Sequence, residues 1–175
     1  MKRLISLVLM FMFMLALVSC DPATHILNAD ELLANTTKIE LVNYENENPQ
    51  IIRNIEGEKK PTFDFNKVTL IATLDDSKLE DVVKDVSDRG YLYFYSALNE
   101  PIGKTLILYQ SNGNMVVLNN CVYTDKTGDT KYYGDCCIYD ANGVFIEYIG
   151  RVGNNYIDSL ESQYFNIDKE SLAYL

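Results

Sequence analysis

The second half of the chain alternates apolar and polar residues with a period of two, which is the pattern of half-buried β-strands. We predict strands at 91–97, 105–110, 114–119, 121–125, 131–139 and 144–149. Three of the connections carry glycine beside a short polar residue: 111–114, 126–129 and 140–143. Glycine accepts the positive φ that tight hairpin turns require. The pattern therefore predicts an antiparallel meander.

The residues before the predicted meander show the spacing of an amphipathic helix. One amphipathic helix is predicted by apolar residues at i, i+3, i+4 and i+7, namely Leu79, Val82, Val83 and Val86. Ser77 and Glu80 form a capping-box pattern at its start, and Gly90 ends it. Further elements are expected on either side: helices at 28–35 and 155–165, strands at 38–44 and 68–74, and an irregular connection at 45–66.

Helices before, beside and after a run of hairpins predict an α+β fold with a single antiparallel meander sheet and helices packed on one face. We expect the other face to meet water or a partner. The order of elements is similar to that of cystatin-like and TATA-binding-protein-like sheets. That resemblance covers the order of elements alone.

The first residues have the layout of a secretory signal, with Lys2 and Arg3 followed by an apolar run over 4–18. A membrane-spanning helix needs roughly 20 apolar residues, so this run is short for a span. The run ends in Leu17-Val18-Ser19-Cys20.

This ending resembles the lipobox of bacterial lipoproteins. The resemblance implies cleavage before Cys20, a diacylglyceryl group on its sulfur, and attachment to the cell membrane on the extracytoplasmic side. The chain would then comprise a signal peptide at 1–19, a lipidated tether at 20–27 and one α+β domain at 28–175. The alternative is an ordinary signal peptide with an incidental cysteine.

The mature chain is strongly acidic. When the two basic residues of the signal are subtracted from the 15 in the chain, 13 remain against 25 acidic residues, a formal charge of −12. Such a charge disfavours binding to nucleic acid and adhesion of the domain's own surface to anionic lipid. We therefore expect the lipid on Cys20, and not the surface of the domain, to attach the protein to the membrane.

Candidate chemistry is limited by histidine and cysteine. The one histidine, His25, lies in the predicted tether, which argues against a Ser-His-Asp or Cys-His site and against zinc sites that rely on histidine. Cys121, Cys136 and Cys137 remain after lipidation of Cys20. Cys136 and Cys137 are adjacent on one strand and point to opposite faces, so no disulfide should join them. A thiolate site stays open, but we favour small buried apolar residues.

The acidic residues do not form a recognisable site. Oxygens alternate along the turn at 125–129, but an EF-hand would need glycine at Thr130 and glutamate at Cys136. A glycosidase-like carboxylate pair depends on a separation in space that sequence does not report. We expect no metal ion and no cofactor.

Tyrosine stands out, with 13 residues and no tryptophan. Tyr91, Tyr93 and Tyr95 alternate with Leu92 and Phe94, so the three phenols share one strand face. If the apolar helix stripe packs on Leu92 and Phe94, the tyrosines face away from the helices and form a candidate binding surface. The alternative is that tyrosines, which favour strands, cover a half-exposed sheet.

The sequence therefore favours a membrane-anchored extracytoplasmic lipoprotein that acts as a non-catalytic binding module. Its expected partners are the membrane, through Cys20, and an extracellular protein, peptide or glycan. A carboxylate- or thiol-dependent enzyme, or an enzyme accessory at the cell envelope, is the alternative.

Overall fold

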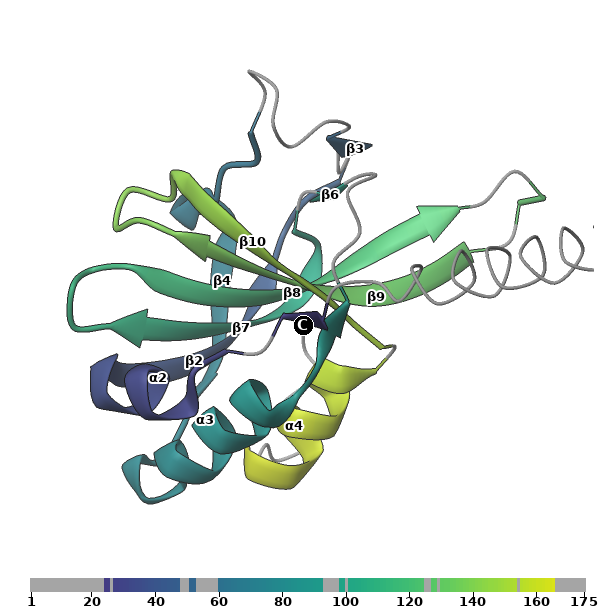
Figure 1. Cartoon of the computed structure of the whole chain (residues 1–175). Helices are drawn as coiled ribbons and strands as arrows, with labels where there is room; N and C mark the ends of the chain where they lie inside the picture. Colours follow the sequence, from purple (N-terminus) through teal and green to yellow (C-terminus); the bar gives the residue numbers. More distant parts are fainter. Residues whose placement is uncertain are drawn as a thin grey trace, which may run out of the picture.

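The computed structural model describes residues 24–25, 27–47, 51–52, 60–92, 98–99, 101–124, 127–128, 130–153 and 155–165. An eight-stranded sheet has the order β1-β5-β10-β9-β8-β7-β2-β4, and a second sheet pairs β3 with β6 (Figure 1). All pairings are antiparallel. The strands are β1 (Thr24–His25), β2 (Thr36–Tyr44), β3 (Ile51–Ile52), β4 (Val68–Thr73), β5 (Tyr91–Leu92), β6 (Leu98–Asn99), β7 (Gly103–Gln110), β8 (Met115–Thr124), β9 (Thr130–Tyr139) and β10 (Phe145–Val152).

Strands β7 to β10 form the predicted meander. Gly113, with a φ of 88°, and Gly143, with a φ of 76°, turn two of its hairpins. The predicted strands 114–119 and 121–125 are one continuous strand, β8. Polar Asn119 interrupts the sequence pattern there, yet it is buried and pairs with Asp135 and Thr105 across the sheet.

The helices are α2 (Ala29–Asn35), α3 (Leu79–Asp88) and α4 (Tyr156–Tyr164), with 3₁₀ turns η1 (Phe65–Lys67) and η2 (Asp76–Lys78). All three α-helices lie on one side of the sheet, as the sequence predicts (Figure 1). The predicted capping box is wrong, because the Asp75 side chain accepts from Ser77 N and forms η2, and α3 begins after Lys78. A competing local hydrogen bond thus displaces the start of α3.

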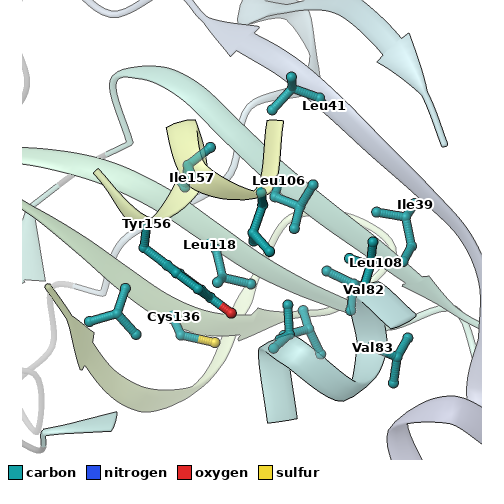
Figure 2. Packing of buried hydrophobic residues seen from close by; sticks show 14 of the residues in the cluster. Ile39, Leu41, Val82, Val83, Leu106, Leu108, Leu118, Cys136, Tyr156 and Ile157 are labelled. Atoms are coloured by element: carbon teal, nitrogen blue, oxygen red, sulfur yellow. The ribbon is translucent and has the colours of Figure 1, made fainter. Parts of the chain in front are cut away.

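The helix-covered face holds the larger core. Leu106, Leu118 and Cys136 from the sheet contact the apolar stripe of α3, and Ile157 and Tyr156 of α4 close over them (Figure 2). Contacts between the helices are partly polar, since the hydroxyl of Tyr156 donates to the carbonyl oxygen of Asp85 at 2.9 Å. This arrangement joins α4 to α3 as well as to the sheet.

The opposite face does not meet water as expected, because a chain segment crosses it. Residues 60–67, here called the strap, place the buried Phe63 ring 5.0 Å from that of Tyr44 and 5.7 Å from that of Tyr139, measured between ring centroids. Phe63 N donates to Gly143 O at 2.8 Å. A second core therefore fills this face, with Val42, Ile107, Met115, Val117, Cys137, Phe145 and Tyr148.

The predicted tether contributes a strand to the sheet. Thr24 pairs with Leu92 and His25 with Tyr91, so β1 is an edge strand of the main sheet. The tether predicted at 20–27 therefore includes two residues that pair with the sheet. The single histidine of the chain, His25, lies in this strand.

Candidate functional site

Tyr91 belongs to the core and not to an exposed surface. Its side chain is 0% exposed and its hydroxyl donates to the carbonyl oxygen of Val86 at 2.7 Å. Leu92 is 41% exposed, so the two residues point the opposite way from the expectation. The other two residues of the candidate surface, Tyr93 and Tyr95, lie outside the described residues.

The inversion has a local cause. Only Arg89 and Gly90 separate α3 from β5, and the last turn of a helix leaves carbonyl groups without intrahelical partners. The Tyr91 phenol reaches back to one of these carbonyls, which requires its side chain to face the helix. Burial raises the pKa of Tyr91 well above its usual value.

Cys136 and Cys137 lie on opposite faces of β9. Cys136 lies in the helix-side core and Cys137 in the core beneath the strap, and both side chains are 0% exposed. Burial raises the pKa of the Cys136 thiol, so it stays protonated at neutral pH. No disulfide joins the two residues, as predicted, and their role is packing. The Cys121 side chain lies outside the described part.

A buried ion pair crosses strands β9 and β10. Arg151 Nε donates to Asp135 Oδ1 at 2.9 Å, and the Tyr148 hydroxyl donates to the same oxygen at 3.2 Å. The Arg151 guanidinium also lies 4.9 Å from the ring centroid of Tyr133. These contacts provide the 0% exposed carboxylate with a counter-charge and hydrogen bonds, which a buried charge requires.

An open groove lies between α2, the β7–β8 turn and the sheet. It encloses a volume of about 420 Å³, within the usual range of small-ligand sites. The residues that line it come from α2 and its approach, from the β7–β8 turn and from strands β7 to β10: Leu27, Asn28, Glu31, Leu32, Asn35, Gln110, Asn112, Asn114, Val116, Ile138, Glu147 and Ile149.

The floor of the groove is aliphatic. Val116 and Ile138 are register partners on β8 and β9, and Ile149 lies beside them on β10. Val116 and Ile149 belong to the helix-side core, and Leu27 and Ile138 pack against it from the groove. The floor is thus an extension of the core and is held by the sheet.

Amide side chains form the rim and are held in place by hydrogen bonds. Asn35 Nδ2 donates to Glu31 O at 2.9 Å, and Asn35 Oδ1 accepts from the Ser111 hydroxyl at 3.2 Å, which joins α2 to the hairpin turn. Gln110 Nε2 donates to the Thr36 hydroxyl at 2.9 Å. Their fixed orientation makes the rim a preorganised set of amide groups.

Two carboxylates face the groove without a counter-charge. Glu31 of α2 and Glu147 of β10 are exposed and lie on different elements of its wall. Among the described residues that line the groove none is basic, and neither carboxylate forms an ion pair within the described ranges. The groove therefore attracts positive charge. In that same part of the chain, no cluster of three His, Cys, Asp or Glu side chains is arranged to hold a metal ion.

Sequence reasoning did not find this groove. The sequence places Asn112 and Asn114 in a hairpin turn, and the Asn112 side chain accepts a hydrogen bond from Asn114 N at 2.9 Å. Gly113 alone satisfies the positive φ of this turn, so the turn does not require two asparagines beside it. These two amide side chains are the signal in the sequence that could have indicated a binding role.

Within the described residues, no helix has the length and apolarity needed to cross a membrane. Comparison of the chain with models of protein families, with curated proteins and with solved structures gave no match.

Proposed function

We propose that this protein is a membrane-anchored, extracytoplasmic lipoprotein whose domain is a non-catalytic binding module. The groove beside α2 is its recognition site, and the ligand is an extended peptide segment with aliphatic and basic side chains. The observation that carries the proposal is the groove itself, with its aliphatic floor, amide rim and two unpaired carboxylates.

The chemical groups of an extended peptide complement those that line the groove. Its backbone offers N–H donors and C=O acceptors, and Asn and Gln side chains provide both complementary groups. An aliphatic side chain of the peptide can cover Ile138 and Ile149 on the floor. The described lining has no aromatic ring on which a sugar could stack, which favours a peptide over a glycan.

The charge of the ligand follows from Glu31 and Glu147. A lysine or arginine side chain would find two carboxylates with no competing cation among the described lining residues. The formal charge of −12 on the mature chain adds a long-range attraction for basic ligands and a repulsion for acidic ones.

A thiol-dependent enzyme finds no support in the two described thiols. Cys136 and Cys137 are buried, and burial raises the pKa of Cys136. We assign the groove carboxylates the role of attracting a positively charged ligand and not that of a general acid or base.

We expect the groove to discriminate between peptides by charge. The mature lipidated chain, held in detergent micelles, should bind an alternating leucine–lysine pentapeptide more tightly than the leucine–glutamate counterpart. Exchanging both carboxylates for amides, Glu31→Gln with Glu147→Gln, should weaken binding of the lysine peptide about three- to tenfold, because an exposed ion pair contributes about 0.2–1 kcal/mol. Fluorescence anisotropy of a labelled peptide measures the affinity.

A matched control separates local from overall charge. Asp76→Asn with Asp81→Asn removes the same charge from exposed positions outside the groove and should leave the affinity nearly unchanged. Equal losses in the two double variants would refute the groove as the site.

The anchor is tested by Cys20→Ala. Loss of the acylated sulfur should move the protein from the membrane fraction to the soluble fraction, because two acyl chains provide stable anchoring and the acidic domain does not. Cell fractionation and the mass of the N-terminal peptide measure the effect. Unchanged membrane association of the variant, with no acyl mass on the wild-type peptide, would refute the anchor.

A further inference from the structure

The edge strand β1 lies very close to the proposed lipid in the sequence. Only residues 21–23 separate Cys20 from Thr24, and Thr24 is paired with Leu92 at the edge of the main sheet. Four residue steps of fully extended chain span at most about 14 Å. The inference drawn from this rests on the proposed lipid anchor.

A tether of this length constrains the domain. Neighbouring strands lie about 4.8 Å apart, so eight strands place β4, at the other edge, roughly 34 Å from β1. The distance between the two edges exceeds twice the reach of the tether. Because of this difference, the β1 edge stays near the bilayer while β4 can lie far from it.

The corner around β1 also suits a lipid surface. Leu92 is an exposed apolar residue beside Thr24, and Arg151 is its register partner on β10. Arg89 lies at the end of α3, next to this edge, together with the acidic Asp85 and Asp88. Arg151 is shared with Asp135, whereas Arg89 is exposed and rests on the Tyr156 ring at 4.7 Å. An apolar side chain with a nearby cation is favourable at the headgroup level of a membrane.

We propose that the β1–β5 edge rests on the bilayer, with Leu92 at the headgroup region and the β4 edge directed away from it. Leu27 and Asn28 line the groove, and only one residue of the sequence separates Leu27 from the end of β1. A ligand of the groove is therefore captured close to the membrane surface.

Two exposed leucines near opposite ends of the strand order, Leu92 on β5 and Leu70 on β4, provide a matched test. Leu92→Cys and Leu70→Cys, with exposed fractions of 41% and 54%, are each labelled with a fluorescent maleimide in the lipidated full chain. The proteins are bound to vesicles of phosphatidylcholine and phosphatidylglycerol that carry a nitroxide on the headgroup, and unsubstituted protein corrects for labelling of native cysteines. We expect quenching at least threefold stronger at position 92 than at position 70.

A spacer variant provides the second measurement. Ten glycine and serine residues inserted between Ala23 and Thr24 should reduce quenching at position 92 towards the value at position 70 while the protein stays bound. Equal quenching at the two positions without the spacer, or a spacer without effect, overturns the orientation while leaving the anchor intact. Failure of the wild-type protein to float with vesicles overturns both the anchor and the orientation.

Discussion

Raising the pH above about 10 should unfold this protein cooperatively, because four tyrosines in its cores retain their protons in the folded state. Burial raises the pKa of each phenol above the ordinary value near 10: Tyr91, Tyr139, Tyr148 and Tyr156. The unfolded chain loses these protons near pH 10 and the folded chain does not. The free energy of unfolding is therefore unaffected well below pH 10 and falls as the pH rises above it.

The expected slope is large. Each phenol lowers the free energy of unfolding by about 1.4 kcal/mol per pH unit above 10, and the four core phenols together by about 5.5 kcal/mol per unit. Absorbance at 295 nm, recorded with circular dichroism, follows ionisation and unfolding together. Tyr139→Phe should reduce the slope by the share of one phenol, about 1.4 kcal/mol per pH unit. Full ionisation of all tyrosines near pH 10 with an unchanged dichroism spectrum would contradict the described cores.

The second large effect is expected for Gly143→Ala, which should lower the free energy of unfolding by about 3 kcal/mol or more. Gly143 has a φ of 76°, and a Cβ atom there would lie 1.9 Å from the carbonyl oxygen of Phe63. A left-handed conformation costs a non-glycine residue about 1–2 kcal/mol. The clash adds to this cost, because a backbone atom of the strap must move and the buried Phe63 ring moves with it.

Gly113→Ala is the matched control. Gly113 turns the neighbouring hairpin with a φ of 88°, but its Cβ would meet only the Ala141 side chain at an ordinary 3.6 Å. The control should lose about 1–2 kcal/mol from the backbone alone. Urea titration measures both variants, and equal losses would show that the strap does not depend on Gly143.

The elements of the fold could be predicted because their signals are local. Alternation along β7 to β10 and the four-residue stripe of α3 are each contained in a short stretch of sequence. The face of the sheet to which a given side chain points could not be predicted in the same way. Alternation places Tyr91 and Leu92 on opposite faces but does not say which face meets the helices, and the hydrogen bond from Tyr91 to Val86 decides it.

The strap and the groove depend on contacts between distant segments. Phe63 sits in a stretch without periodicity, and its burial follows from the turn at Gly143, far along the chain. The groove needs α2, the β7–β8 turn and β10 together, so no single segment carries its signature. Glu31 and Glu147 likewise line the same groove only because of the fold.

The most direct test of the proposed recognition site is a methyl NMR titration of the lipidated chain in micelles with the leucine–lysine pentapeptide. Ile138 and Ile149 report on the groove floor, and Ile107, buried beneath the strap on the opposite sheet face, serves as the internal reference. We expect saturable shifts of the Ile138 and Ile149 methyl signals, with the Ile107 signal unchanged. Unchanged Ile138 and Ile149 signals at a peptide excess, or shifts centred on Ile107, would contradict this expectation.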